Sequence, residues 1–296
     1  MIEKLLKHKS LTVAAFVLPL LAFVLIIIVY PIFDLFWLSL SDATLAQPFN
    51  RAFVGLQNFV KFVRDPVTLS SLKYTFIFIF SAVGVQLPLG LGLALLLSSS
   101  LINKGYRYIP LFVLPLAIAP VITALFWRIL LHNQFGLVNF LLNRIGLNPI
   151  MWWGNPSLTP FTLIIIDTWR WTPFVLLILY AGLTSIPKTL LEAAQVDGAS
   201  GFQVLRHIKL PMIKKHIFVA VLLRFVLAQK KVFDIISATT GGGPGRATET
   251  LNFRIYKVMF SEFDLGYTAA LSIVLLVIII SVTQPVVRRI WGRDES

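Results

Sequence analysis

Six long runs of apolar residues, separated by shorter polar segments, dominate the pattern of this chain. Each run holds about 20 residues, which is the length that an α-helix needs to cross the hydrocarbon core of a bilayer. The runs cover Leu11–Tyr30, Leu72–Leu97, Ile109–Leu131, Leu158–Tyr180, Ile217–Ile236 and Gly266–Val287. The pattern predicts an all-α membrane protein with six transmembrane helices.

The first run raises the question of a cleavable signal peptide, because Lys4, Lys7 and Lys9 precede it. Its apolar stretch is longer than the roughly 7–15 residues of a signal peptide, and no small-residue cleavage site follows. We therefore expect a retained membrane anchor.

The distribution of Lys and Arg sets the expected orientation, because cytoplasmic loops of membrane proteins carry an excess of these residues. Both termini are basic, and the short loop between the second and third runs carries Lys104 and Arg107. These features predict that both termini are cytoplasmic. The polar segment between the fourth and fifth runs then also faces the cytoplasm.

Composition agrees with lipid as the main solvent. Of the 296 residues, 57% are hydrophobic and 13% are charged, whereas a soluble domain is about 25% charged. The net charge is +13, but the basic residues are scattered over loops and form no stripe, so we expect no nucleic-acid partner. The absence of cysteine removes disulfides, thiolate metal sites and cysteine nucleophiles.

The polar segment 185–215 is predicted to contain two short helices. Pro187 suits the first turn of a helix, since its missing N–H is not needed there. Gly198 would end this helix with a chain reversal that needs positive φ. A second helix, with apolar residues at three-residue spacing, is expected to end at Pro211. The apolar positions of the two helices are Leu190, Leu191, Ala194, Phe202, Leu205 and Ile208.

Two purely structural interpretations of this segment remain open. Thr189 and Glu192 have the spacing of a capping box, in which Glu192 satisfies the N-terminus of its own helix. Alternatively, the two helices lie in the headgroup layer as an amphipathic anchor.

The same segment resembles the EAA signature of binding-protein-dependent ABC importer permeases. Its spacing is reproduced without gaps by Glu192-Ala193-Ala194, then Gly198, then Ile208, and finally Leu210-Pro211. Asp197-Gly198-Ala199 also matches a common form of the signature. Other segments are similar to the carbohydrate subfamily, which includes maltose and glycerol-phosphate permeases. They are residues 135–139, 181–183, 186–187, 232–234, 240–244, 247–250, 256, 265–267 and 269–271.

The resemblance implies that segment 185–215 is a coupling helix seated in a cleft of a cytoplasmic ATPase subunit. Glu192 would pair with a basic residue of the ATPase, and Phe202 and Leu205 would pack into its cleft. The full set implied in coupling is Glu192, Ala193, Ala194, Asp197, Gly198, Ala199, Phe202, Leu205, Ile208, Leu210 and Pro211.

The resemblance also implies a type I ABC importer permease fold at a bacterial cytoplasmic membrane. Residues 1–71 would form the anchor and first extracytoplasmic loop, 72–290 the five-helix core and 291–296 a cytoplasmic tail. The expected partners are a second permease subunit, two ATPase subunits that bind ATP and Mg²⁺, and an extracytoplasmic solute-binding protein. The chain itself would be non-catalytic, with no cofactor or metal. Its solute would be a sugar or sugar-like compound: a disaccharide, polyol, glycoside or glycerol phosphate.

Ionisable residues inside the predicted spans are candidates for the solute path, because charges in a bilayer are costly and usually functional. Asp167 and Arg170 are three residues apart, so they share a helix face and can neutralise each other. The candidate lining is Asp167, Trp169, Arg170, Arg224 and Gln229. The structural alternative is that Asp167 and Arg170 form a buried packing pair while Arg224 meets carbonyls or the partner subunit.

The glycine-rich run Gly241–Gly245 is not a phosphate-binding loop, because no Lys-Ser or Lys-Thr follows it. The predicted topology puts it outside, where we expect a turn that contacts the binding protein or caps the last spans.

Two other classes of function make different demands on the sequence. An ion-coupled secondary transporter often shows inverted repeats and carboxylate relays, whereas Asp167 is the sole acid in the middle of a predicted span. An intramembrane enzyme would need a metal or nucleophile constellation, but all four histidines fall in loops or at the ends of spans. The importer permease is therefore the preferred prediction.

Overall fold

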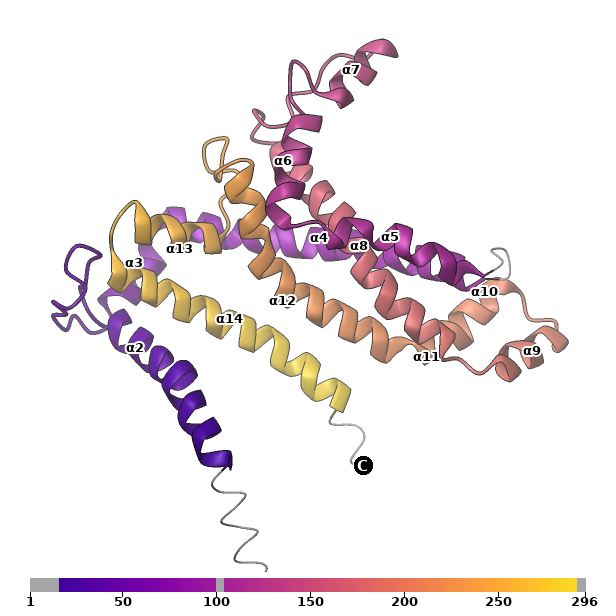
Figure 1. The fold of residues 1–296 in the computed structure, drawn as a ribbon, viewed down its shortest axis with the longest axis horizontal. Coiled ribbons are helices and arrows are strands. Elements are labelled where there is room, and N and C mark those ends of the chain that lie inside the picture. Colours follow the sequence, from indigo (N-terminus) through magenta and orange to yellow (C-terminus); the bar gives the residue numbers. More distant parts are fainter. Residues whose placement is uncertain (1–15, 100–103, 292–296) are drawn as a thin grey trace, which may run out of the picture. The chain divides into compact units, whose positions relative to one another are not determined.

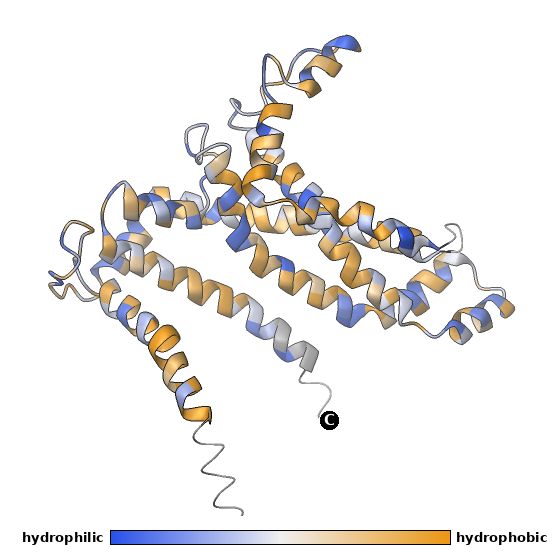
Figure 2. Cartoon of the chain, viewed as in Figure 1, coloured by the Kyte–Doolittle hydropathy of each residue, from blue (hydrophilic) through white to orange (hydrophobic). Residues whose placement is uncertain are grey.

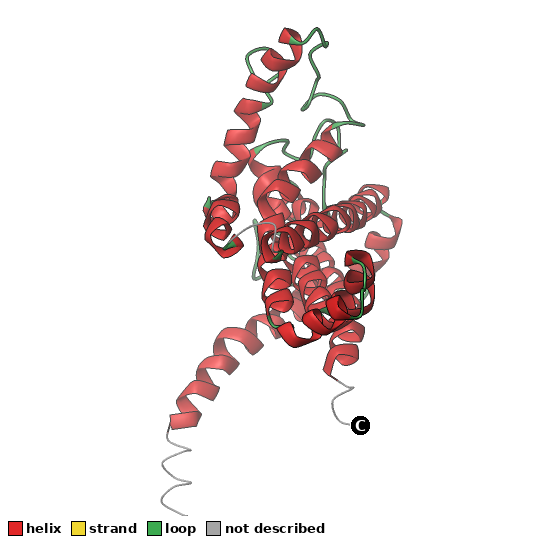
Figure 3. Ribbon diagram, turned by 90° about the vertical axis from the view of Figure 1, so that its right-hand side faces the viewer, coloured by secondary structure: helices red, strands yellow, loops and turns green. Residues whose placement is uncertain are grey.

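The computed structural model describes residues 16–99 and 104–291, and helices account for nearly all of the regular structure in this part of the chain (Figures 1 and 3). Among the described residues, the β-structure is limited to isolated bridges such as Ser41 with Phe53. The all-α prediction is therefore confirmed. The α-helices are α2 (Tyr30–Ser39), α3 (Gln57–Arg64), α4 (Pro66–Ser98), α5 (Ile109–Ala117), α6 (Pro120–Leu130), α7 (Leu137–Arg144), α8 (Thr159–Thr184), α9 (Lys188–Val196), α10 (Gly201–Val204), α11 (Leu210–Met212), α12 (Lys214–Ala238), α13 (Leu251–Phe260) and α14 (Leu265–Trp291).

The first apolar run forms a helix that is displaced from its predicted range. Helix covers Phe16–Ser39 without interruption, so it passes the predicted end at Tyr30; the predicted start at Leu11 lies outside the described residues. A π-helical stretch, Leu25–Val29, comes directly before Pro31. The wider helical turn lets the chain continue through a proline that would otherwise end an α-helix.

The third run, predicted as one continuous span, is broken in two. Helices α5 and α6 meet at an angle of 88° around Ile118 and Ala119. Both residues have extended backbone angles, and Ala119 precedes Pro120, whose ring disfavours helical geometry in the residue before it. The predicted range Ile109–Leu131 is therefore not one continuous helix.

Within residues 16–99 and 104–291, four helices are long and apolar enough to cross a membrane, and the bent α5–α6 pair would make a fifth span. The four are Phe16–Ser39, Pro66–Ser98, Thr159–Thr184 and Leu265–Pro285. Helix α12 has 25 residues but contains several charged side chains, among them Arg224, Lys230 and Lys231. Figure 2 shows this contrast: α4 and α8 are mainly hydrophobic, whereas hydrophilic residues mark α9–α11 and both ends of α12.

Backbone contacts divide the chain into two compact units, Met1–Pro66 with Ile255–Val277, and Val67–Arg254 with Ile278–Ser296. In the first unit, Asn58 donates to the carbonyl oxygens of Ser39 and Ser41 at 2.9 and 2.8 Å and fixes α3 against the end of α2. In the same unit, Lys61 forms an ion pair of 2.7 Å with Asp264.

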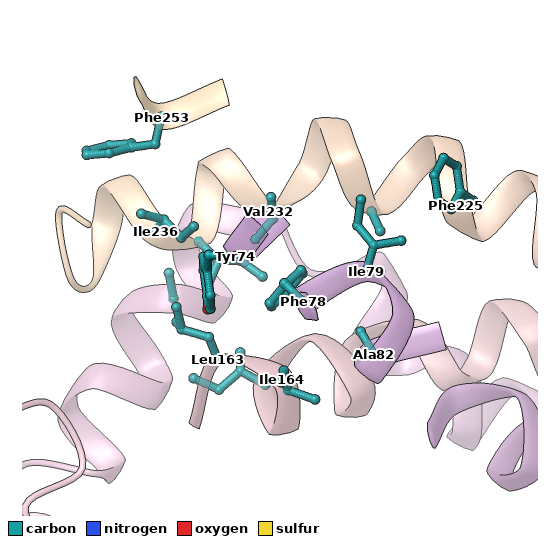
Figure 4. Packing of buried hydrophobic residues seen from close by; sticks show 14 residues of the cluster. Tyr74, Phe78, Ile79, Ala82, Leu163, Ile164, Phe225, Val232, Ile236 and Phe253 are labelled. Carbon is teal, nitrogen blue, oxygen red and sulfur yellow. The ribbon is translucent and has the colours of Figure 1, made fainter. Parts of the chain in front are cut away.

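Two buried apolar clusters hold the second unit together. The first joins α4, α8 and α12 through residues such as Phe78, Leu163 and Ile236 (Figure 4). The second lies at the other end of the same helices and includes Leu176 and Ile213. Both ends of the α4–α8–α12 core are therefore packed, so these helices can act as a common support for polar groups between them.

Close packing of α4 on α8 depends on a glycine, which gives a testable prediction. A Cβ atom at Gly90 would lie 2.7 Å from Val175 Cγ1 and 3.1 Å from the backbone nitrogen of Leu176. Gly90→Ala should therefore lower the free energy of unfolding by about 1–3 kcal/mol. Thermal unfolding of the purified protein in detergent measures the effect.

Gly92→Ala is the matched control, because it lies on the same helix and a Cβ there would meet no atom within 4 Å. This variant should be neutral or more stable, since alanine favours helix over glycine by about 0.5–1 kcal/mol. Equal stability of the two variants would contradict the close approach of α4 and α8.

Candidate functional site

The α9–α11 segment begins with a helix whose N-terminus differs from one of the sequence interpretations. Helix α9 starts after Pro187, which is its N-cap and makes no side-chain capping bond. Thr189 therefore lies inside the helix, and the capping box of Thr189 with Glu192 is not formed. A capping box forms instead at Ser200, whose backbone N–H donates to Gln203 Oε1 at 2.7 Å. Glu192 is exposed, so its carboxylate is available for another contact.

Gly198 adopts the geometry that the sequence predicts. Its φ is +74°, and two hydrogen bonds close the end of α9: Ala199 N–H to Ala194 C=O at 2.9 Å and Gly198 N–H to Gln195 C=O at 3.1 Å. This is the Schellman pattern, in which glycine occupies the left-handed position just after a helix. In the signature, Gly198 therefore occupies the position that ends the helix containing Glu192, Ala193 and Ala194.

The second part of the segment stays helical longer than predicted. Helix α10 runs into a π-helical stretch, Leu205–Lys209, and then into α11. Pro211 lies in the first turn of α11 rather than at its end. The wider π-helical turn just before it lets the helix continue through this proline, as at Pro31. The predicted end at Pro211 is therefore wrong, and the helical turn ends at Met212.

The segment exposes some apolar side chains and buries others. Phe202 is 68% exposed and Val196 is 88% exposed, whereas Leu205, Ile208 and Leu210 are half-buried. Between the two helical parts lies a concave surface with a volume of about 380 Å³. Its lining is Ala194, Asp197, Gly198, Ala199, Gln203, Val204, His207 and Ile208.

Buried contacts attach this segment to the long helices. Ile186 and Ile213, which flank it, are 6% and 0% exposed and belong to the second apolar cluster. Leu191 of α9 and Leu210 of α11 pack against the same cluster. The segment thus combines an exposed surface with a firm attachment to the ends of α8 and α12.

A second polar site lies between α4, α8 and α12, where Gln86, Asp167 and Arg224 form a closed triangle. Arg224 Nη2 donates to Asp167 Oδ2 at 2.7 Å, Arg224 Nε donates to Gln86 Oε1 at 2.7 Å, and Gln86 Nε2 donates to Asp167 Oδ2 at 2.8 Å. All three residues are fully buried. A buried charge pair of this kind needs additional hydrogen bonds to offset its desolvation, and Gln86 supplies them.

The expected pairing of Asp167 with Arg170 is therefore wrong, because Asp167 pairs with Arg224 from another helix. Arg170 donates instead to the carbonyl oxygens of Pro115 and Ile118 and to Thr123 Oγ1. These partners surround the break between α5 and α6. Because a broken helix leaves carbonyl groups without their helical partners, Arg170 stabilises the break by satisfying them.

Tryptophan side chains flank these charges on two sides. The Arg224 guanidinium lies 4.6 Å from the ring centre of Trp171, in cation–π geometry. Trp169 meets Trp127 edge to face with 5.6 Å between ring centres. It also lines a mainly apolar cavity of about 410 Å³ between α4, α5 and α8, together with residues such as Leu89, Phe112 and Thr168.

The fifth candidate, Gln229, has no hydrogen bond to the triangle among those observed. It follows Arg224 by five residues on α12, and its backbone carbonyl oxygen accepts a hydrogen bond from Asn252 on α13. Its Nε2 is buried without a partner among the described residues. The structure thus brings Asp167, Arg170 and Arg224 into one region, with Trp169 on the adjoining cavity.

Sequence reasoning missed Gln86, Thr123 and Trp171. Gln86 had a recognisable signal, because it is an amide in the middle of an apolar run. Several buried polar atoms of this region have no hydrogen-bond partner among the described residues, including Asp167 Oδ1, Arg224 Nη1 and Trp171 Nε1. Buried polar atoms without partners are costly, so this region can accept a hydrogen-bonding ligand or water. Within the described residues, no three histidine or carboxylate side chains gather as metal ligands would.

The triangle predicts an asymmetric response to mutation. Asp167→Asn leaves the charge of Arg224 buried without a counterion, so it should destabilise the protein by about 3–5 kcal/mol. The double variant Asp167→Asn with Arg224→Gln removes both charges and should recover most of that loss. Thermal unfolding in detergent checks both. If the double variant is as unstable as the single one, the loss does not come from the unpaired charge of Arg224.

Known proteins are similar to this chain over nine-tenths or more of its length. It is 37% identical to the trehalose/maltose transport system permease protein MalF of Thermococcus litoralis, over 90% of this chain and 89% of the relative. It is 33% identical to the sulfoquinovosyl glycerol transport system permease protein SmoG of Agrobacterium fabrum, over 99% and 92%. It is 34% identical to the sn-glycerol-3-phosphate transport system permease protein UgpA of Yersinia pestis, over 90% of each chain.

The fold is also shared with solved structures. A subunit of a bacterial ABC transporter that imports the acidic polysaccharide alginate superposes with a TM-score of 0.84, at 23% identity and over 98% of both chains. The family model described as "Binding-protein-dependent transport system inner membrane component" matches residues 86–286. The chain therefore belongs to the family of binding-protein-dependent transport system inner membrane components and is a non-catalytic permease subunit of an ABC importer.

Proposed function

We propose that this permease carries a sugar or sugar-like solute across a bacterial cytoplasmic membrane and is driven through the α9–α11 segment. The observation that carries the proposal is the combination in that segment of an exposed surface, a rigid glycine turn and a buried attachment to α8 and α12. The solute class is supported by the relatives, whose names include trehalose, maltose and sulfoquinovosyl glycerol.

We further propose six membrane spans, with both termini in the cytoplasm. Helix α12 is the additional span, because 25 residues extend about 37 Å at 1.5 Å per residue. Lys214 and Lys215 begin the helix, and Lys230 and Lys231 lie about two turns before its end at Ala238, from where their long side chains can extend toward the headgroups. Its central Arg224 is neutralised by Asp167. The bent α5–α6 pair is one span, and Arg170 satisfies the carbonyl oxygens that its break leaves free.

The proposed partners follow from this arrangement and from the family. Two ATPase subunits that bind ATP and Mg²⁺ would receive the α9–α11 segments of this chain and of a second permease subunit. An extracytoplasmic solute-binding protein would deliver the solute, and a complex with a periplasmic protein carrying an alginate pentasaccharide is known for a structural neighbour. In this scheme 1–71, 72–290 and 291–296 remain the anchor with its outer loop, the transport core and the tail.

In the proposed coupling, Glu192 pairs with a basic residue of the ATPase and Phe202 enters its cleft. Both side chains are exposed. Because the second apolar cluster joins the segment to α8 and α12, displacement of α9 moves these helices as a rigid body. The remaining residues of the matching signature shape the turn and the concave surface next to it.

The proposed solute path runs beside the Gln86–Asp167–Arg224 triangle. Asp167 Oδ1, Arg224 Nη1 and Trp171 Nε1 supply polar groups without partners among the described residues, and Trp169 supplies an aromatic surface. Hydroxyl-rich solutes use both kinds of contact. An ion-coupled secondary transporter is not proposed, because the family couples transport to a separate ATPase.

Two substitutions in the α9–α11 segment test the proposed coupling. Gly198→Pro should abolish ATP-driven uptake, because proline cannot adopt the φ of +74° that this position requires. Glu192→Lys should lower uptake about ten-fold or more, since juxtaposed like charges at an interface cost several kcal/mol. Uptake by the assembled importer in proteoliposomes, with ATPase activity measured in parallel, checks both variants.

Gly201→Ala is the matched control, because a Cβ atom there meets nothing within 4 Å and its φ is not in the left-handed region. It should support normal uptake. Normal uptake by Glu192→Lys as well would reject docking through this carboxylate.

A further inference from the structure

A cavity separate from the triangle lies at the end of the second unit away from α9–α11. It has a volume of about 280 Å³ and is formed by the end of α6, the loop before α8 and the turn after α12. Its lining is Arg128, His132, Asn133, Trp153, Thr239, Thr240, Gly243 and Pro244. The proposed orientation puts this cavity on the extracytoplasmic side.

The cavity contains polar atoms that the described part of the chain leaves without partners. Trp153 Nε1, a donor, and Asn133 Oδ1, an acceptor, are buried there without a hydrogen bond to any described residue. Buried polar groups in folded proteins are nearly always paired. An unpaired donor and an unpaired acceptor in one cavity therefore indicate a ligand that both accepts and donates, as a hydroxyl group does.

Other lining groups add donors but no carboxylate. The backbone N–H of Gln134 donates to His132 Nδ1 at 3.2 Å, so the neutral imidazole carries its proton on Nε2. Arg128 donates to the carbonyl oxygen of Ala238 at 3.4 Å and has further N–H groups. This donor-rich, acid-free lining suits neutral or anionic ligands and disfavours cations.

The walls of the cavity are fixed by hydrogen bonds. Asn139 Nδ2 donates to the carbonyl oxygens of Asn133 and Ile150 at 3.0 Å each, and Asn139 Oδ1 accepts from the Ile150 N–H at 3.1 Å. On the opposite wall, Thr248 Oγ1 donates to the carbonyl oxygen of Gly243 at 2.6 Å. A site held in this way loses little entropy when a ligand binds.

Aromatic residues continue inward from the cavity. Trp127 precedes the lining residue Arg128 on α6, and its ring meets Trp169 edge to face. Trp169 in turn lines the apolar cavity beside α5 and α8. Trp127 and the lining residue Trp153 both pack against the first apolar cluster, so aromatic side chains extend from this cavity to Trp169.

We propose that this cavity is a reception site for one pyranose ring of the solute, neutral or anionic. Trp153 provides the aromatic face and an N–H donor, Asn133 the acceptor and Arg128 the cationic donor. The proposal rests on the proposed function, because it names a site for the same solute class.

Saturation-transfer NMR tests the site on the assembled importer in nanodiscs without its binding protein. The probes are methyl α-glucoside, which is neutral, and glucuronate, which is anionic. The wild-type complex should transfer saturation to the ring protons of at least one probe. Trp153→Phe and Asn133→Ala should each weaken binding about ten-fold, because each removes one buried hydrogen-bonding group.

Trp152→Phe is the matched control. Its indole is paired with Asn139, whose Oδ1 keeps a hydrogen bond from the Ile150 N–H. This variant should retain the probe signal. Trp153 also packs against the first apolar cluster, so the thermal unfolding of Trp153→Phe is measured in parallel. Asn133 is not part of that cluster, so a loss of signal in Asn133→Ala tests the site separately.

Equal signals from the wild type and both cavity variants, or no signal from either probe, would overturn the site. If the variants instead weaken stimulation of the ATPase by the unloaded binding protein and leave probe binding unchanged, the cavity receives part of that protein and the proposal is wrong. ATP-driven uptake of the solute carried by the binding protein is measured separately. If ATP drives uptake but neither probe shows saturation transfer to its ring protons, this site alone is rejected. If a probe shows saturation transfer but ATP does not drive uptake, the proposed function is contradicted.

Discussion

The buried attachment of the α9–α11 segment to the ends of α8 and α12 is the constraint on which the rest of the account depends. Ile213 is fully buried between α11 and α12, and Ile186 is nearly so between α8 and α9. The two long helices also approach closely there, because a Cβ atom at Gly182 would lie 2.7 Å from the His216 ring. An exposed segment without this attachment would move independently of the spans and transmit nothing.

The same two helices carry the polar triangle in their middle. Asp167 lies on α8 and Arg224 on α12, and Gln86 joins both to α4. Arg170, one turn further along α8, holds the break between α5 and α6. Under the proposed function, a displacement applied at one end of α8 therefore reaches the charged groups and the broken helix together. Close packing opposes separate deformation of the helices, because close-packed interiors transmit strain between neighbouring elements.

The sequence predicted what depends on short-range spacing. Run length predicted the helices, and the distance from Ala194 to Gly198 predicted the turn, because a glycine just after a helix has one favoured geometry. The sequence did not predict that Asp167 pairs with Arg224. Residue spacing identifies neighbours on the same helix, but it does not show which residues of α12 face α8. The break between α5 and α6 was missed for a related reason: its carbonyl groups are satisfied by Arg170, which is distant in sequence. Gln86 could have been found by treating amides in apolar runs as candidates.

The most direct test of the central claim uses the absence of cysteine from the chain. A single cysteine at Val196, which is 88% exposed on α9, should react with a membrane-impermeant thiol reagent from the cytoplasmic side. Assembly with the ATPase subunits should protect it. A cysteine at Asn148, in the exposed loop after α7, should react from the outside in both states. Reaction at position 196 from the outside would contradict a cytoplasmic location of this segment. Reaction from the cytoplasmic side that assembly does not slow would contradict its binding to an ATPase subunit.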